Sequence, residues 1–543
     1  MKGKSALLAG VAAIALVASA DAGYAAKKSS DTTSAPAATA PVQSGPTNAE
    51  LAARIQALED ALQADEAKAQ GEHTRLSTLE QNFNYTTWTF DNGRPVVNSG
   101  DGRFSLALRV RFQADYASFL QDSPASQPNA QYKDLSNGAA VRRAFFGVEG
   151  KAFNDFWYEF RYNAGGGGGA ESGDPAVSIA RVAYVGIPHF RINVGVIEPA
   201  FMLEGTTSSG QLMFLERPEI ENIALDSFGA ADARRGVEVA FQYENMILPG
   251  DNFIWTAAYT GQKTTAPSAA GSPGAGHGNT GDEGTQVLSH LSYRFWSDGP
   301  SNALIGADYG NILYAGGIAN GGGGIQFRDR PEIRVDGTRL IDTLSFGAAP
   351  AVGGCKAGGA TYSCHATMFA GHVAGNYENF YLAGEYAYFR DDRNYYISAS
   401  HTNVHDHPEF NGYALEGSWV LPGEPKGYAV NATNNEIGGF GAPKVASPFS
   451  LNGDSWGAWE LVARYSFTNL DWYRTVGGEG IAGGREGIVD VGLNWYLNNE
   501  VKLQFHDSIV HVNKQASVGS TSAATTQVGQ DLNIIGVRLQ FSN

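Results

Sequence analysis

The sequence has little cysteine, little charge and no long apolar run beyond its first residues. It has only two cysteines among 543 residues, too few for a zinc site built from cysteine ligands. Charged residues make up 17%, against about 25% in ordinary soluble domains. The net charge of −17 excludes the basic field that nucleic acids require, so we expect no nucleic-acid partner. After the N-terminal run, no window reaches 18 apolar residues, so the sequence predicts no transmembrane helix.

Glycine and aromatic residues are abundant instead. The chain has 68 Gly, 28 Phe, 24 Tyr and 9 Trp. Glycine is nearly twice its usual share of about 7%. Many turns and many aromatic side chains favour an all-β fold, and they argue against a helical bundle or a largely disordered chain.

The N-terminus has the layout of a secretory signal peptide, which we predict at residues 1–26. Lys2 and Lys4 precede an apolar run of 13 residues, and small residues follow it. Residues 27–48 are small, polar or Pro and predict a disordered linker. An exported chain without an apolar helix can span a membrane only as a closed barrel.

Residues 49–84 predict the one long helix, a periplasmic coiled-coil segment. Leu51, Ile55, Leu58 and Leu62 are spaced 4, 3 and 4 residues apart, as in a heptad seam. A seam this short is marginal in isolation, so we expect the helix to associate with copies of itself. The alternative is a helix that packs on its own domain.

From about residue 103 the apolar period changes to two. Apolar residues from Phe104 to Tyr116 alternate with polar ones that include Arg109 and Arg111. In a soluble sandwich the apolar face would cover a core, whereas in a membrane barrel it faces lipid and the polar face lines an aqueous lumen.

The number of such segments favours the barrel. We predict a 16-stranded antiparallel transmembrane β-barrel within residues 100–543, because the strands suit a bilayer and the connections mostly alternate between short turns and long loops. Residues 422–455 are long where a short turn is expected, so an eighteen-strand barrel is the alternative. The role of the longest loop, 313–366, stays open. The predicted strands are 103–113, 140–149, 155–163, 178–187, 190–197, 235–243, 252–260, 286–296, 303–312, 367–376, 379–390, 411–421, 456–467, 486–497, 500–511 and 532–541.

Collinear stretches spread along this region carry a resemblance to a known family. Examples are VRRAFFGVEGKAFNDFWYEFRYNAGG at 141–166, INVGVIEPAFMLEGTTSSGQLMFLERPEIENIA at 192–224 and VGLNWYLNNEVKLQFH at 491–506. In these the chain resembles the phosphate-selective porins of the O and P type, which are trimeric outer-membrane channels. The resemblance implies a homotrimer and a third loop folded into the pore. Residues 198–234, the long connection after the fifth predicted strand, are that loop; its candidate constriction residues are Glu204, Glu216, Arg217, Arg234 and Arg235.

Arginines on the polar faces of the strands are the candidate anion-selectivity residues. Arg keeps its charge and binds phosphate with a planar fork, and the chain has 25 Arg against 13 Lys. The Arg142-Arg143 pair matches the arginine ladder of the resembled family. For each arginine the alternative is a solvated charge paired with a neighbouring acid such as Glu149 or Glu159. The candidates are Arg109, Arg111, Arg142, Arg143, Arg161, Arg191, Arg464 and Arg538.

The sequence therefore predicts a passive channel for small anions such as phosphate in the outer membrane of a Gram-negative bacterium, surrounded by lipid. We expect no enzymatic activity, no cofactor and no metal site, and we expect Cys355 and Cys364 to close a small disulfide loop. The alternatives are a general or cation-leaning porin, a structural outer-membrane protein whose coil contacts peptidoglycan or a partner, and a secreted soluble β-sandwich or lectin.

Overall fold

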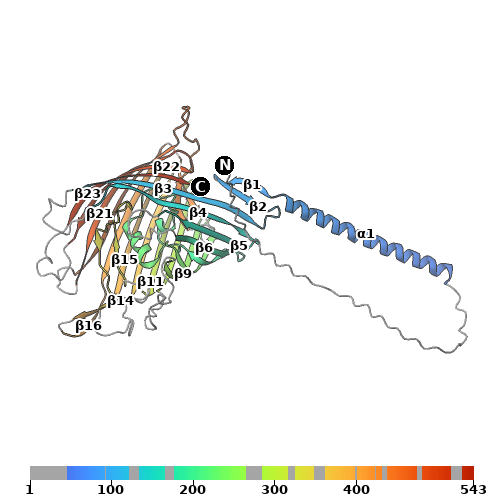
Figure 1. Ribbon diagram of the computed structural model, residues 1–543, viewed down its shortest axis with the longest axis horizontal. Coiled ribbons are helices and arrows are strands. Elements are labelled where there is room, and N and C mark those ends of the chain that lie inside the picture. The colour runs from blue at the N-terminus through green and yellow to red at the C-terminus, as the bar shows by residue number, and fades with distance from the viewer. Residues whose placement is uncertain are drawn as a thin grey trace, which may run out of the picture. The chain divides into compact units, whose positions relative to one another are not determined.

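Sixteen antiparallel strands form a closed barrel in the computed structural model (Figure 1). The last strand pairs with the first of the ring, from Leu532 opposite Gln121 to Ser542 opposite Arg111, and this pairing closes the barrel. The predicted 16-stranded all-β barrel is confirmed. The strands are β3 (Ser105–Gln121), β4 (Gly138–Ala152), β5 (Phe156–Asn163), β6 (Ala176–Tyr184), β7 (Phe190–Ile197), β8 (Arg234–Glu244), β9 (Asn252–Lys263), β10 (Thr285–Asp298), β11 (Ser301–Tyr314), β14 (Tyr362–Tyr377), β15 (Phe380–Ile397), β17 (Glu409–Leu421), β20 (Ala458–Trp472), β21 (Ile481–Tyr496), β22 (Val501–Asn513) and β23 (Gln530–Ser542).

Twelve stretches of the chain are described by the structure. The predicted signal peptide, most of the predicted linker and Cys355 lie outside them; Cys364, the other cysteine, is disulfide-bonded. No helix in these stretches is both long enough and apolar enough to cross a bilayer. The stretches are 46–91, 93–121, 134–165, 176–263, 284–315, 324–347, 361–397, 400–421, 424–430, 437–473, 480–514 and 529–543.

The predicted alternation holds along the first and last strands of the ring. In β3, Leu106, Leu108 and Phe112 are exposed on the outer surface, whereas Arg111, Gln113 and Asp115 are buried inside. Outer faces rich in Leu, Val, Phe and Tyr suit a lipid environment. Short turns gather at one end of the barrel, which we call the periplasmic end because outer-membrane barrels place short turns there.

The long segment after β17 does not add strands to the barrel. β17 pairs directly with β20, with Leu421 opposite Trp459, so the count of sixteen stands. Within this segment, β18 (Lys426–Val430) and β19 (Ile437–Pro443) form a separate two-stranded hairpin. Phe440 of the hairpin stacks edge-on against the luminal Tyr381, and Tyr428 accepts a hydrogen bond from Asn252, so the hairpin packs inside the periplasmic half of the lumen.

A second periplasmic hairpin precedes the barrel and is absent from the sequence prediction. β1 (Thr87–Asp91) pairs with β2 (Arg94–Asn98), and β2 pairs with the start of β3. The helix α1 (Asn48–Asn84) comes before it along the chain. In the single chain the predicted seam of α1 is exposed, with Leu58 at 70% and Leu62 at 63%. β16 (Thr402–Asp406) extends the sheet beside the outer end of β15.

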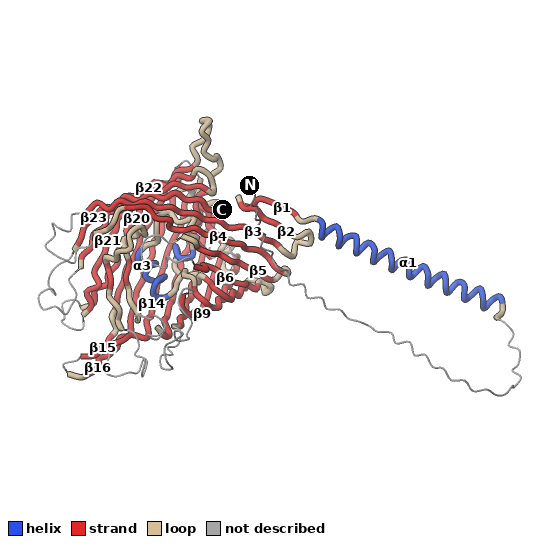
Figure 2. The backbone as a smooth tube through the Cα atoms, viewed as in Figure 1, coloured by secondary structure: helices blue, strands red, loops and turns tan. Residues whose placement is uncertain are grey.

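Two long loops fold into the interior of the barrel. The loop between β7 and β8, called L3 below, contains α2 (Leu203–Thr206), α3 (Glu219–Ile223) and a π-helical turn (Ala224–Phe228). L3 reaches as far as Lys502 and Gln540 near the periplasmic end of the barrel. The loop after β11 contains β12 (Arg328–Asp329) and β13 (Ile341–Asp342). In Figure 2 the short helices lie within the ring of strands.

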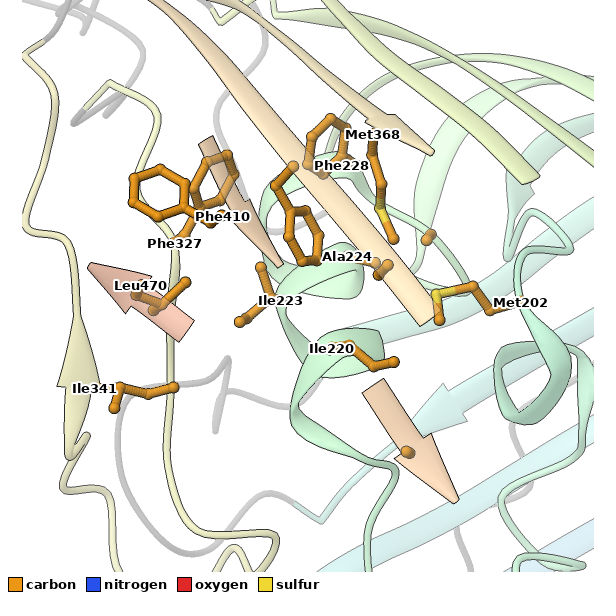
Figure 3. Packing of buried hydrophobic residues seen from close by; sticks show 14 of the residues in the cluster. Met202, Ile220, Ile223, Ala224, Phe228, Phe327, Ile341, Met368, Phe410 and Leu470 are labelled. Atoms are coloured by element: carbon orange, nitrogen blue, oxygen red, sulfur yellow. The ribbon is translucent and has the colours of Figure 1, made fainter. Parts of the chain in front are cut away.

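These loops and the barrel wall share an apolar core (Figure 3). Phe228 of L3 stacks on Phe327 of the second loop, and Phe327 contacts the wall residues Phe389 and Phe410. The inner face of the barrel is therefore apolar where these loops cover it, which alternation along the strands does not predict. Inward residues such as Phe389 are apolar because a folded loop, rather than water, covers them.

Candidate functional site

An arginine-lined cavity lies between the inner wall of β3–β5 and L3. Its volume is about 130 Å³. Because about 10–15 Å³ already admits one water molecule, the cavity has room for a small ion with water around it. The five arginines that line it are Arg109, Arg111, Arg143, Arg161 and Arg217, and L3 adds Glu198, Thr207, Ser208 and Ser209.

Arg111 reaches from β3 to the hydroxyl groups of L3. Its two terminal nitrogens each donate a hydrogen bond of 2.7 Å, one to Ser208 Oγ and one to Ser209 Oγ. Its Nε donates to Ser542 Oγ at 3.1 Å. The guanidinium and the hydroxyls therefore present several donors to the same small space, which is the donor set that phosphate and similar oxyanions take.

Arg109 shares an acidic partner with a residue outside the barrel strands. Its Nε lies 2.5 Å from Glu149 Oε2. Arg94, at the turn of the β1–β2 hairpin, donates to Glu149 Oε1 at 2.6 Å. Glu149 is buried, with a side chain 3% exposed. The hairpin thus adds a sixth guanidinium near the cavity and divides the charge of Glu149 between two arginines.

Arg142 and Arg143 both turn inward because the strand carries a bulge. The pairing of β3 with β4 shifts between Gln113 and Ala114, so two residues of β4 lie opposite one position of β3. Arg142 donates to both carboxylate oxygens of Glu216, at 2.6 and 3.1 Å, and Arg143 lies 3.4 Å from the same carboxylate. Strict alternation would have sent one of these arginines into lipid.

Glu216 is the carboxylate of L3 that Arg142, Arg143 and Arg538 all contact. Burial alone would raise the pKa of Glu216, but the guanidiniums of Arg142, Arg143 and Arg538 outweigh burial and hold that pKa well below its ordinary range. Glu216 is therefore a permanent anion that attaches L3 to the basic wall.

Arg538 and Arg464 lie behind L3 and outside the lining of the cavity. Arg538 donates two hydrogen bonds, of 2.6 and 2.7 Å, to the carboxylate of Asp115 and lies 3.1 Å from Glu216. Arg464 contacts Glu332 and lies 3.4 Å from Glu204, with its guanidinium over the ring of Phe214. Both side chains are fully buried. Their contacts support a role in holding L3 and the second loop, rather than in contacting a solute.

Arg161 and Arg191 continue the basic wall along neighbouring strands. Arg161 forms an ion pair with Glu159 at 2.6 Å. Glu159 also pairs with Arg181, a buried arginine absent from the sequence prediction. Arg191 lies 3.7 Å from Glu238. It also lines a second, larger cavity of about 580 Å³ near the periplasmic turns. Arginine and carboxylate alternate along this wall, so much of its positive charge is locally compensated.

Of the remaining residues predicted for the constriction loop, Arg217 lies in L3, whereas Arg234 and Arg235 lie at the start of β8, so their predicted place in the loop is wrong. Arg217 donates to the backbone oxygens of Glu204 and Thr207 and also lines the cavity. Arg234 donates to Asp232 at 3.1 Å. Arg235 lies partly buried next to a second register shift, between Arg234 and Gly236. Both arginine doublets of the sequence therefore sit at irregularities of the sheet.

Carboxylates gather on the opposite side of L3. Backbone N–H groups of Leu203 and Glu204 donate to Glu385 on the wall, and Glu204 also donates to Glu221. Burial raises the pKa of Glu221 to about 7, although a hydrogen bond with Glu385 opposes the shift. Burial, reinforced by the charge of Glu486, raises the pKa of Glu219 well above its usual value. L3 thus separates a basic wall from an acidic one.

Three buried or partly buried basic residues that pair with inner carboxylates escaped the sequence prediction. Arg94 lies in a short hairpin whose Pro95 obscures the strand pattern, and the contact to Glu149 spans 55 residues. Arg181 lies inside a predicted strand with inward parity, so the same rule that selected Arg191 could have found it. Lys426 pairs with buried Glu460 at 3.0 Å, which only the folded hairpin brings about.

A family model decides the class of protein. The model of the phosphate-selective porins O and P matches residues 106–542. The chain belongs to this porin family. This porin forms a channel in the outer membrane of a Gram-negative bacterium.

Solved porins are also similar to this one, and no curated protein matches it. The anion-selective porin from Comamonas acidovorans is 11% identical, with a TM-score of 0.43, and the match covers 81% of this chain and 100% of that one. OmpF of Salmonella typhi in complex with daunomycin is 13% identical, with a TM-score of 0.40, and the match covers 84% and 100%. OmpT of Vibrio cholerae in its trimer form is 10% identical, with a TM-score of 0.40, and covers 81% and 99%.

Proposed function

We propose that this porin is a homotrimeric channel for the passive diffusion of small anions, with phosphate among its solutes. The observation that carries the proposal is the cavity between β3–β5 and L3, which five arginines line. Positive charge spread over several sites lets an anion enter and also leave. Selectivity for anions in general, rather than tight binding of one solute, follows from the carboxylates that compensate part of this charge.

The hydroxyl groups of L3 support oxyanions among those solutes. Ser208 and Ser209 accept hydrogen bonds from Arg111 and line the cavity beside it. Each hydroxyl can donate one hydrogen bond, and each guanidinium several, so an ion with three or four oxygens finds more donors here than chloride can use. We therefore expect phosphate to occupy the cavity longer than chloride and to reduce the chloride current.

Reversal potentials of the purified porin in a planar bilayer under a KCl gradient test the proposal. We expect a potential of the sign that marks anion preference, and a fall in chloride conductance when phosphate is added. A cation-leaning reversal potential would overturn anion selectivity. An anion-leaning potential without block by phosphate would overturn the phosphate part alone.

Paired substitutions locate the selectivity within the cavity. Arg109→Gln together with Arg111→Gln should lower the anion-to-cation permeability ratio. Arg390→Gln is the matched control, because Arg390 is 44% exposed at the outer end of β15 and does not line the cavity. If both variants behave alike, Arg109 and Arg111 do not set selectivity.

The acidic wall favours a second candidate, a general or cation-leaning porin. Glu204 and Glu221 of L3 lie together beside Glu385 of the wall, although Arg464 lies 3.4 Å from Glu204 and Arg217 lies 3.6 Å from Glu221. A lumen with opposite charges on its two sides creates a transverse field, which orients polar solutes without strongly preferring anions. The same reversal-potential measurement separates this candidate from the first.

The exposed seam of α1 supports self-association. Leu58 and Leu62 expose most of their side chains in the single chain, and burying such leucines against copies of α1 gains about 1.5–3 kcal/mol each. We include a three-stranded periplasmic coil in the proposal. The alternative is a structural role, in which this coil contacts peptidoglycan. Co-sedimentation of the porin with purified peptidoglycan, with and without residues 49–83, tests that contact.

A further inference from the structure

We propose that His290, Asp308 and His372 form a binding site in the barrel wall for a divalent transition-metal cation of the zinc type. The three residues belong to neighbouring strands, β10, β11 and β14, and all three are buried on the inner face. One ligand atom from each lies within 4.8 Å of the others. Sequence analysis predicted no metal site, because 82 residues separate the two histidines and only the sheet brings them together.

The sheet register brings the three side chains together. His290 lies directly opposite Asp308, and His372 lies opposite Gly306, two positions along β11. Glycine at 306 is required, because a Cβ there would come within 2.0 Å of His372 Nε2. The His372 ring therefore lies over Gly306 and parallel to His290, with ring centres 5.5 Å apart and planes 9° apart.

The donor set suits zinc, nickel or copper(II) better than magnesium or calcium. Two imidazoles and one carboxylate are the ligands that these softer cations take, whereas magnesium and calcium prefer oxygen alone. His290 Nδ1 lies 2.7 Å from one oxygen of Asp308, and His372 Nδ1 lies 3.1 Å from the other. Small shifts of these side chains would open a common position for a cation.

A further observation indicates that the group accommodates a cation. Within the described chain, Asp308 forms ion pairs only with the two histidines, whereas the wall carboxylates Glu149 and Glu159 each contact an arginine. No arginine or lysine among the described residues pairs with Asp308, so the buried carboxylate has no partner with a permanent positive charge. A metal cation would supply that charge.

The site is joined to L3. The backbone N–H of Met202, near the start of L3, donates to Asp308 Oδ1 at 2.8 Å. Met202 has a φ of 55°, a strained conformation for a residue with a side chain. A cation on Asp308 would fix the carboxylate that holds this strained residue. Metal binding should therefore stabilise the porin as well as occupy the wall.

Calorimetric titration of the purified, chelator-treated porin in detergent with ZnCl₂ tests the proposal. We expect one zinc ion per chain, retained in excess MgCl₂, and a rise in Tm on binding. His372→Gln and Asp308→Asn should each weaken binding at least tenfold. Gly306→Ala should also weaken it, because the new methyl group displaces the His372 ring without removing a ligand.

His511→Gln is the matched control. His511 also pairs with an aspartate, Asp531, but both are largely exposed at the outer end of the barrel. If zinc binding is absent from the wild type, survives His372→Gln, or disappears in His511→Gln, the proposal is wrong and the group is a hydrogen-bonded clamp for L3. If His372→Gln does not fold, His290→Gln removes an equivalent ligand. Anomalous scattering at the zinc edge should place the ion between the three side chains.

Discussion

Single arginines in this porin owe their roles to local irregularities and to partners far away in the sequence. Arg142 and Arg143 reach the lumen together only because of the bulge opposite Gln113. Arg109 reaches the cavity by simple alternation, yet its effective charge depends on how Glu149 is shared with Arg94. We therefore expect a residue outside the barrel strands to contribute to the proposed selectivity of the cavity.

Arg94→Gln should lower anion preference even though Arg94 does not line the cavity. Without Arg94, the whole charge of Glu149 falls on Arg109, and the local potential becomes less positive. We expect the anion-to-cation permeability ratio to fall roughly two- to fivefold, equivalent to ~0.4–1 kcal/mol, the usual range for a partly exposed ion pair. Reversal potentials in a KCl gradient measure this change.

Arg103→Gln controls for the loss of one periplasmic arginine. Arg103 is 53% exposed and pairs with Asp101, away from Glu149. This variant should keep the wild-type permeability ratio. Equal ratios for wild type and Arg94→Gln would show that the hairpin plays no part in selectivity.

At the scale of elements, L3 is held from two sides by different forces. The basic wall binds it through Glu216, whose charge is permanent. On the acidic side, Glu221 of L3 is hydrogen-bonded to Glu385, and burial raises the pKa of Glu221 to about 7, so its protonation changes near neutral pH. The attachment of L3 therefore depends on pH on one side only.

Thermal stability should fall as the pH rises from 5 to 8. The pKa of Glu221 in the folded porin is about 7, raised from 4.5, so the associated stability is full below about pH 4.5 and is lost as the pH rises through about 7. The loss is roughly 3 kcal/mol at most. Glu221→Gln, which resembles the protonated acid, should flatten the profile of Tm against pH.

Glu378→Gln is the corresponding control, because Glu378 is exposed in the β14–β15 turn. It should leave the slope of Tm against pH unchanged. A slope that is the same in the wild type and in Glu221→Gln would assign the pH dependence to other acids.

The β18–β19 hairpin is expected to narrow the periplasmic half of the lumen. Lys426 is paired with Pro443 across the hairpin, so residues 427–442 can be replaced by an Asn-Gly turn. The shortened hairpin keeps the contact of Lys426 with Glu460 but loses Tyr428 and Phe440. Single-channel conductance should rise. Gly427→Ala, with open space around the new methyl group, should leave it unchanged.

On the scale of the whole molecule, the local sequence pattern predicts the strands of the barrel but not the loops and contacts inside it. All sixteen strands follow from a period of two, which each segment carries on its own. The inward position of the apolar residues Phe389 and Phe410 cannot be predicted from this period, because their partner Phe327 lies in a loop without periodicity. Six of the eight arginine candidates follow from parity, whereas the inward position of both Arg142 and Arg143, the Arg94 contact and the histidine group depend on tertiary pairing.

Removing residues 49–83 should separate assembly from conduction. We expect the shortened porin to insert and conduct like the full chain, because the cavity and L3 are built from residues beyond 94. Its trimers should dissociate at lower temperature in detergent, since the Leu58 and Leu62 seam is gone. Native mass spectrometry and bilayer recording measure the two effects. Loss of all conductance would contradict this division of roles.

The apolar interior also affects how the strands find their alignment. Near the outer end of β23, Ile534 faces the core and Ile535 faces lipid, so a slip by one residue would exchange two equivalent side chains. Nearer the periplasm, the same slip would bring Arg538 out of its contact with Asp115 and into hydrocarbon. A one-residue slip of β23 is therefore costly mainly in its C-terminal half, around Arg538. We expect misaligned barrels to be destabilised there rather than near Ile534.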